Sequence, residues 1–285
     1  MVDAIIFPSS FFDKRAVDED LEKEYEAAKS CNLFSDILIF SYEDWFHSGK
    51  LTLNHMPTEV VTAVYRGWMM LPEQYEKFYQ ALNEKNVQLI TTPDAYERFH
   101  LFPNIYSQLA DDTPRILLFP SGTPIDIEKV KNAFSRFMVK DYVKSVKGTD
   151  FPTCFDASIT QQEFDKKMEL FYQYRGTLLT GGICVKEFVE LRKYGDHKNE
   201  YRVFYINGNI ATISRNSGQF ACAPVPPSEL IKKYNGLESK FYTIDFAELA
   251  DGRWVIIEAG DGSVSGLSDF QDYHEFFRAL YYSFM

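Results

Sequence analysis

Two predicted β-hairpins in the last third of the chain constrain its fold most strongly. Their turns are Asn207-Gly208 and Asp251-Gly252, and two-residue hairpin turns favour such Asn-Gly and Asp-Gly dipeptides. Runs rich in β-branched and aromatic residues flank both turns, as strands require. The paired strands are Glu200–Ile206 with Asn209–Arg215, and Phe241–Ala250 with Arg253–Ala259. An antiparallel sheet is therefore expected in this region.

Residues 1–95 have a different pattern, in which short apolar runs alternate with amphipathic helical segments. Such alternation predicts an α/β lobe with a mostly parallel sheet. The expected strands are Ala4–Phe7, Asp36–Tyr42, Val60–Tyr65 and Val87–Ile90. The expected helices are Val17–Ser30 and a segment that begins at Pro72, a residue favoured in the first helical turn.

The remaining chain is expected to form two further lobes, residues 96–180 and 181–285. A proline-rich connector with short helical pieces runs from Thr92 to Pro124. Beyond it we predict helices and strands in the following order: helix Ile125–Phe134, strand Phe137–Tyr142, helix Thr160–Tyr172, strand Gly182–Leu191, the two hairpins, and a final helix Asp269–Phe284. The predicted fold class is α/β (α+β).

Asp245 and Glu258 are charged residues inside otherwise apolar strands of the second hairpin. Counting outward from a two-residue turn places them directly opposite each other, with Cβ atoms about 5 Å apart. Two carboxylates this close repel each other, and a hard cation such as Mg²⁺ relieves the repulsion. Asp261 follows Glu258 closely enough to supply a third oxygen. The alternatives are that a nearby Arg or Lys neutralises the pair, or that both acids face solvent.

Lys140 lies inside the predicted strand Phe137–Tyr142, and Lys144 and Lys147 follow it in a polar loop. Ammonium groups and loop amides both donate hydrogen bonds to phosphoryl oxygens. The loop contains no GxxxxGK[ST] sequence, so it is not a P-loop. The pattern suits nucleotide phosphates, although strand lysines are also common without a ligand.

Two other segments have a functional and a purely structural interpretation. The strand end at Glu187, Phe188 and Val189 leaves backbone groups free to pair with adenine, or it is a buried edge strand. Glu200 and Arg202 point to the same face of the first hairpin. Counting from its turn places Glu200 opposite Arg215, which predicts either a cross-strand ion pair or arginines that stabilise a transferred phosphoryl group.

Composition narrows the class of protein. The net charge of -11 counts against general binding to nucleic acids or anionic lipid. The four cysteines are dispersed without a CxxC pair, and no run approaches the length of a membrane span, so a soluble cytoplasmic protein is expected. The histidine spacing does not predict a zinc site.

The order of these segments resembles the ATP-grasp superfamily: a strand lysine, a mobile loop, a hinge strand, a hairpin with Glu and Arg, and two acids on a final hairpin. Four segments further resemble its arginine-to-lysine clade, namely Arg66-Gly67-Trp68, Phe137–Ser145, Glu200–Phe204 and Ile257–Ser263. The resemblance implies an ATP-grasp fold, with an N-terminal α/β lobe and two lobes containing antiparallel sheet that enclose the nucleotide. One departure is Gly260, which stands where the family usually has Asn.

The resemblance also implies roles for individual residues. ATP-binding roles fall to Lys140, Lys144, Glu187, Phe188, Val189 and Glu200. Catalytic roles at the phosphate or acyl intermediate fall to Arg202, Arg215 and Lys144. The implied magnesium ligands are Asp245 and Glu258, with Asp261 in place of the missing Asn. Arg66, at a strand end of the first lobe, could reach the substrate.

The activity implied is ATP-dependent ligation of a carboxylate to an amine through an acylphosphate, with release of ADP and phosphate. The cofactors would be ATP and Mg²⁺, and the substrate a small molecule, peptide or protein. Two alternatives are a phosphotransferase or nucleic-acid end-joining enzyme on the same fold, and a non-catalytic nucleotide-binding protein. The joint presence of Lys140, Asp245 and Glu258 disfavours the non-catalytic interpretation.

Overall fold

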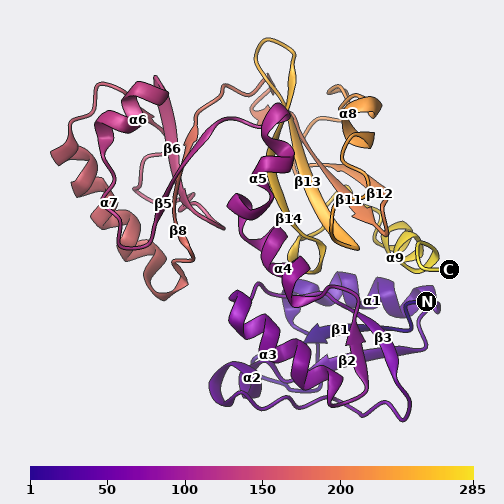
Figure 1. The fold of residues 1–285 in the computed structure, drawn as a ribbon. Coiled ribbons are helices and arrows are strands. Elements are labelled where there is room, and N and C mark those ends of the chain that lie inside the picture. The colour runs from indigo at the N-terminus through magenta and orange to yellow at the C-terminus, as the bar shows by residue number, and fades with distance from the viewer.

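Three lobes, each with its own β-sheet, make up the structure, a computed structural model that describes residues 1–285 (Figure 1). The mixed α/β class and the antiparallel sheets in the second and third lobes confirm the predicted fold class. None of the helices is long and apolar enough to span a membrane.

The N-terminal lobe contains a parallel sheet in the order β2-β1-β3-β4, as the alternating pattern predicted. Its strands are β1 (Ala4–Pro8), β2 (Asp36–Phe40), β3 (Val61–Tyr65) and β4 (Val87–Leu89). Its helices are α1 (Glu22–Cys31), α2 (Tyr42–Ser48) and α3 (Pro72–Asn83). Helix α2 was not predicted: β2 ends early because the hydroxyl of Ser41 accepts a hydrogen bond from the Asp44 amide and caps a helix there.

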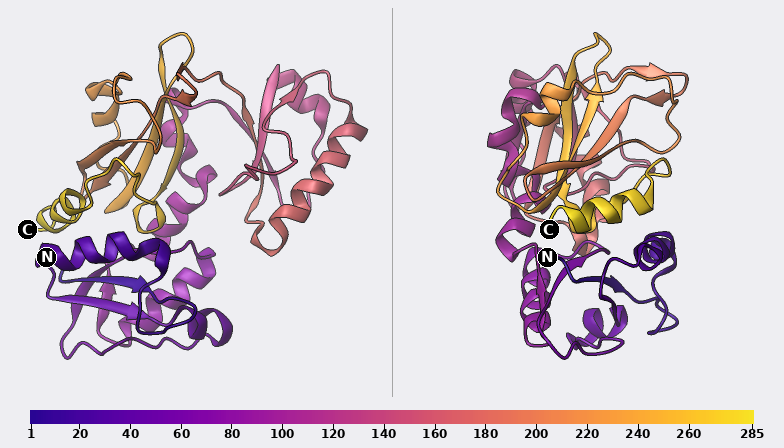
Figure 2. Two further views of the ribbon diagram at one scale, coloured as in Figure 1. Left: turned by 180° about the vertical axis from the view of Figure 1, so that it is seen from behind. Right: turned by 90° about the vertical axis from the view of Figure 1, so that its right-hand side faces the viewer.

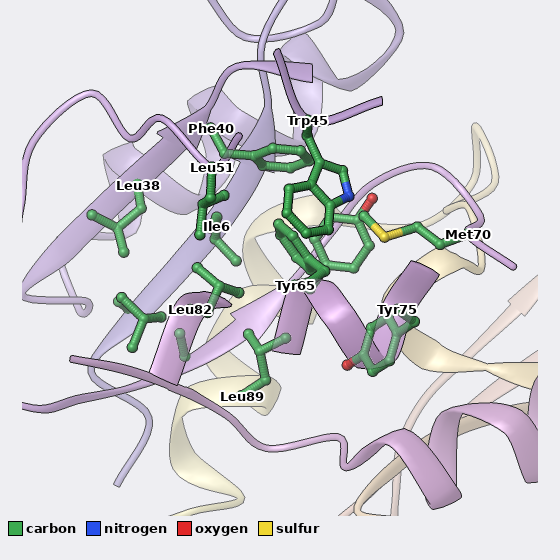
Figure 3. Close-up of a cluster of buried hydrophobic side chains, with 14 of the residues drawn as sticks. Ile6, Leu38, Phe40, Trp45, Leu51, Tyr65, Met70, Tyr75, Leu82 and Leu89 are labelled. Atoms are coloured by element: carbon green, nitrogen blue, oxygen red, sulfur yellow. The ribbon is translucent and has the colours of Figure 1, made fainter. Parts of the chain in front are cut away.

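One face of this sheet packs against α2 and α3 in an aromatic core (Figure 3). Tyr75, Phe78 and Leu82 recur at helical spacing along α3 and are fully buried. The opposite face is covered by α1 and by the last helix, α9 (Tyr273–Tyr282). The two chain ends therefore lie side by side (Figure 2).

The central lobe contains an antiparallel sheet in the order β5-β8-β6-β7, with α6 (Ile127–Ala133) and α7 (Gln161–Arg175) packed on one face. Its strands are β5 (Ile116–Pro120), β6 (Arg136–Asp141), β7 (Phe155–Asp156) and β8 (Gly182–Glu187). Strand β5 lies in the segment expected as a connector. The expected boundary at residue 180 also separates β8 from the sheet to which it belongs.

The C-terminal lobe contains the two predicted hairpins in one antiparallel sheet, in the order β12-β11-β13-β14. Its strands are β11 (Glu200–Ile206), β12 (Asn209–Arg215), β13 (Phe241–Glu248) and β14 (Trp254–Asp261). Helices α4 (Pro93–His100), α5 (Phe102–Leu109) and α8 (Ser228–Lys232) bury one face of this sheet. A small hairpin, β9 (Lys193–Tyr194) and β10 (His197–Lys198), follows the link from β8.

Candidate active site

A cavity of about 100 Å³ lies where β13, β14 and the loop that follows β14 meet α4 and α5. Most of the polar side chains in its wall are charged, including Lys144, Arg202, Asp245, Glu258 and Asp261. The cavity therefore brings together five of the residues to which the sequence assigned a role.

Asp245 on β13 lies directly opposite Glu258 on β14, as predicted. The prediction assumed a two-residue turn, but the turn contains three residues, 250–252, between Leu249 and Arg253. This shifts the strands by one position near the turn, so that Glu248 faces Trp254. A β-bulge next to Asp245 restores the register, because it leaves one residue of β14 unpaired.

Each of these carboxylates has a cation beside it. The Arg202 guanidinium donates to both oxygens of Asp245, at 2.8 and 2.7 Å, and Nη1 also donates to the Gly266 carbonyl at 2.9 Å. Lys140 comes from the central lobe, and its Nζ lies 3.5 Å from Glu258 Oε1. Neutralisation by Arg and Lys, one of the alternatives open from the sequence, is therefore what the structure shows.

The electrostatics of the site follow from burial and from this clustering of cations. Burial alone would raise the pKa of Glu258, but the surrounding Lys140, Lys144, Arg202 and Lys147 hold it at about 2. Burial likewise opposes the charged form of Arg202, yet Asp245 raises the pKa of its guanidinium. Both groups are thus charged at neutral pH.

A second lysine from the central lobe was not singled out from the sequence. Lys186 on β8 is 5% exposed, and its Nζ donates to the Ile257 carbonyl of β14 at 2.7 Å. Burial and the nearby Lys140 lower its pKa to about 8. Strand alternation could have identified Lys186 from the sequence. Lys140 pairs with Cys184, and Lys186 lies two residues beyond Cys184, on the same face of the sheet.

The hinge residues lie at the end of β8. Glu187 is bound through its side chain to Arg115, at 2.9 and 3.0 Å, and the Phe188 ring stacks under Arg136. The amides of Glu187 and Phe188 donate to the carbonyls of the same two arginines. The Val189 amide has no hydrogen-bond acceptor in the protein.

The predicted pairing of Glu200 with Arg215 is wrong. The Asn207-Gly208 turn forms as predicted, but β12 carries an extra residue, Ala211, so that Arg215 faces Tyr201 instead. Glu200 accepts a hydrogen bond from the Asn216 side chain at 3.1 Å. The Arg215 guanidinium stacks on Phe270, 3.8 Å from the ring centroid, and does not line the cavity.

Asp261 is not part of a metal-binding cluster with the other two acids. No group of three or more His, Cys, Asp or Glu side chains is arranged to hold a metal ion. Asp261 is fully buried, and its Oδ1 accepts a hydrogen bond from the Ser263 amide at 2.9 Å. Its Oδ2 has no partner, and burial raises the pKa of the carboxyl to about 7.

Magnesium still fits the remaining pair. Mg²⁺ is usually held by one or two carboxylates together with phosphate oxygens, rather than by a cage made only of protein ligands. Asp245 and Glu258, opposite each other on adjacent strands, provide that donor set once a nucleotide brings its phosphates. Arg202 and Lys140, which now balance their charge, are themselves suited to phosphate.

Arg66 does not reach the cavity. It is 2% exposed and forms a two-pronged ion pair with Glu24 of α1 at 2.7 and 2.8 Å, while Nη1 donates to the Gly262 carbonyl. Next to it, the Gly67 amide donates to the Ser263 carbonyl at 3.1 Å. Arg66 thus ties the N-terminal lobe to the loop after β14, which lines the cavity.

Comparison with known proteins bears on this site. Residues 128–280 match the model of an ATP-grasp domain family, family 3 of the arginine-to-lysine clade. No curated protein sequence matches the chain.

Several solved structures share the fold along nearly the whole chain. D-cycloserine synthetase DcsG superposes with a TM-score of 0.63 at 13% identity, covering 98% of this chain and 99% of that chain. ATP-grasp ligase PsnB, complexed with a minimal precursor, gives 0.61 at 11% identity and covers 100% of both chains. D-alanyl-alanine synthetase A from Vibrio cholerae O1 gives 0.60 at 12% identity, covering 99% of this chain and 98% of that chain.

Proposed function

The chain belongs to family 3 of the arginine-to-lysine clade of ATP-grasp domains, and on this basis we propose that it is an ATP-dependent ligase that joins a carboxylate to an amine. The observation that carries the proposal is the charged cluster between two lobes, in which Lys140 of the central lobe meets Asp245, Glu258 and Arg202 of the C-terminal lobe. Such a cluster suits a metal-bound nucleotide held between the lobes.

The central lobe would hold the nucleotide. Lys140 and Lys186 lie on the face of β6 and β8 that turns towards β14, where ammonium groups can donate to phosphate oxygens. Val189 offers the free amide that an adenine edge requires. Lys144 and loop 145–149 would close over the phosphates, and Glu200 would take part in nucleotide binding.

The C-terminal lobe would provide the charge needed for phosphoryl transfer. Bound ATP and Mg²⁺ supply the phosphoryl group that converts a poor leaving oxygen of the carboxylate into a good one. Asp245 and Glu258 would hold the metal, next to the guanidinium of Arg202. Arg202 would then face the transferred phosphoryl and the acyl group, where a fixed cation stabilises developing negative charge.

A catalytic role is less well supported for Arg215 than for Arg202, because the Arg215 guanidinium stacks on Phe270 outside the cavity. We therefore do not place it at the reacting atoms. Since one of the similar structures is ATP-grasp ligase PsnB complexed with a precursor peptide, peptides belong in the substrate panel together with amino acids and small amines.

The test is incubation with ATP, Mg²⁺ and pooled carboxylates and amines, with ADP, AMP, phosphate and pyrophosphate measured separately. Release of ADP and phosphate is expected. Asp245→Asn and Glu258→Gln should each lower turnover on the order of 100-fold, as loss of one charge-stabilising group does. AMP and pyrophosphate as products would rule out the acylphosphate route.

A matched control is Asp251→Asn, which makes the same substitution in the exposed turn of the same hairpin. It should leave turnover unchanged. Binding provides a readout that does not depend on the substrate: Mg-ATP at 100 times its Kd should add about 2.7 kcal/mol to the free energy of unfolding of the wild type. Absence of any thermal shift would contradict the nucleotide site itself.

A further inference from the structure

Asp141, the last residue of β6, shapes the turn that carries Lys144. It is fully buried, and its Oδ1 accepts the amides of Val143 and Lys144 at 2.7 and 2.6 Å. Its own amide donates to the Lys144 carbonyl at 2.9 Å. An Asp side chain that accepts amides from residues further along the chain folds the backbone into a tight turn. Both backbone groups of Lys144 are therefore held by Asp141.

Strand alternation explains why this turn is needed. Lys140 and Asp141 are neighbours in β6, so their side chains point to opposite faces of the sheet. Lys140 faces β14, where its Nζ lies 3.5 Å from Glu258, whereas Asp141 faces α7. The turn returns the chain to the Lys140 side, so that Lys144 lines the cavity and, like Lys140, lowers the pKa of Glu258. Two adjacent residues thus place two lysines at one site, Lys140 directly and Lys144 through the turn.

The second oxygen of Asp141 has a different partner. Oδ2 accepts a hydrogen bond from Arg175 Nε at 2.7 Å, and Arg175 Nη2 donates to the Leu178 carbonyl at 2.7 Å. The Asp141 side chain is 0% exposed and that of Arg175, the last residue of α7, is 12% exposed. Because breaking a buried ion pair is costly, Oδ2 contributes to the stability of the central lobe. Oδ1, in contrast, shapes the turn.

The side chain of Lys144 is free to bind a ligand. Lys144 is exposed and lines the cavity together with Arg202 and Asp245, and its hydrogen bonds are those of its backbone. A lysine on a mobile backbone loses conformational freedom when it binds a phosphate oxygen, and a backbone fixed in advance lowers this cost. Asp141 does not line the cavity, so it can affect a ligand there only through the groups that it holds.

We propose that Asp141 is a positioning residue, which holds Lys144 ready to bind the nucleotide phosphates through the hydrogen bonds of its Oδ1. The inference rests on the proposed function for the identity of the ligand as Mg-ATP. It adds to the nucleotide site a residue that lies outside the cavity and on the opposite face of the sheet from Lys140.

Isothermal titration calorimetry with Mg-ATP, and separately with adenosine, tests this role. Lys144→Met should weaken Mg-ATP binding on the order of tenfold or more, as loss of a hydrogen bond to a charged group does. Asp141→Ala should weaken it by a similar factor, because without the turn Lys144 is no longer held beside the phosphates. Adenosine has no phosphates, so both variants should bind it like the wild type.

Two further variants separate positioning from stability. Arg175→Met removes the partner of Oδ2 and leaves the hydrogen bonds of Oδ1 in place. It should lower the melting temperature, as Asp141→Ala does, but bind Mg-ATP like the wild type. The double variant Asp141→Ala with Lys144→Met should bind Mg-ATP as Lys144→Met alone does, because changes that act through one group are not additive.

Asp141→Asn provides a test that does not depend on whether the alanine variant folds. Its side-chain oxygen can accept the same two amides, although the charge that faces Arg175 is lost. It should therefore lose stability but keep the wild-type affinity for Mg-ATP. An Asp141→Asn protein that binds Mg-ATP as weakly as Lys144→Met would overturn the proposal.

The remaining outcomes distinguish this inference from the proposed function. Failure of the wild type to bind Mg-ATP would refute the nucleotide site itself, and the positioning role with it. Where the wild type binds, four results each refute the positioning role alone. They are an unchanged Mg-ATP affinity in Asp141→Ala or Lys144→Met, an equal loss of affinity in Arg175→Met, a further loss in the double variant, and a loss of adenosine binding in Asp141→Ala.

Discussion

The buried ion pair between Arg66 and Glu24 is expected to hold the N-terminal lobe to the cavity loop, and Glu24→Gln tests this. The two side chains belong to residues that are 2% and 4% exposed, and they meet through two hydrogen bonds of 2.7 and 2.8 Å. The rings of Phe204, Phe241 and Phe276 surround the guanidinium, with centroids 5.3 to 6.0 Å from Cζ.

Glutamine keeps the shape of the glutamate but leaves the Arg66 charge buried and unbalanced. Breaking a buried pair in this way costs about 3–5 kcal/mol of the free energy of unfolding. For a chain of this size, each kcal/mol lowers the melting temperature by roughly 2 °C, so a decrease of about 6–10 °C is expected. Replacing both partners, with Glu24→Leu and Arg66→Met together, should recover most of the loss, because the desolvation cost is also removed.

The assay is urea denaturation followed by circular dichroism, without nucleotide. Glu187→Gln is the matched control, since Glu187 forms the same two-pronged pair with Arg115 at the surface, where that arginine side chain is 63% exposed. Exposed ion pairs contribute little to stability, so this variant should have nearly the same free energy of unfolding as the wild type. A Glu24→Gln protein that loses no more stability than Glu187→Gln would refute the reasoning.

Three further outcomes are expected. The folded-state pKa of Glu258, about 2, lies below its ordinary value of 4.5, so the stability that it contributes is complete above pH 5 and is lost as the pH falls towards 2. In urea denaturation, the difference in the free energy of unfolding between the wild type and Glu258→Gln should therefore become smaller as the pH falls. A difference that stays constant would contradict this. The lowered pKa of Lys186, about 8, means that its charge is lost above that pH, so Mg-ATP affinity should fall between pH 7 and 9 in the wild type but not in Lys186→Met, measured by titration calorimetry. Gly182→Ala should cost about 1–3 kcal/mol in denaturation, because its Cβ would lie 2.5 Å from the Phe119 carbonyl and push β5 from β8, whereas Gly266→Ala, with open space, should change little.

The sequence was sufficient where local chemistry decides structure. Asn207-Gly208 specifies its turn, since both residues adopt positive φ, at 49° and 79°. Pro72 and the apolar spacing after it specify α3. The order of strand lysine, hinge and acidic hairpin was likewise sufficient to identify the ATP-grasp superfamily, which the family match confirms.

The register of the strand pairs β11–β12 and β13–β14 depends on β-bulges that the sequence does not predict. Both hairpins carry one, and each bulge moves the pairing by one residue. In the first hairpin this separates Glu200 from Arg215. In the second, the longer turn and the bulge cancel, so Asp245 still meets Glu258.

Contacts between lobes were decided by the tertiary structure alone. The acidic pair in β13 and β14 is visible in the sequence, but Arg202 and Lys140 reach it from another strand and another lobe. The buried oxygen of Asp261 is equally invisible, because a missing hydrogen bond is defined by everything packed around it. Local sequence thus places charged residues on strands, and only the packing of the three lobes determines which of them meet a partner.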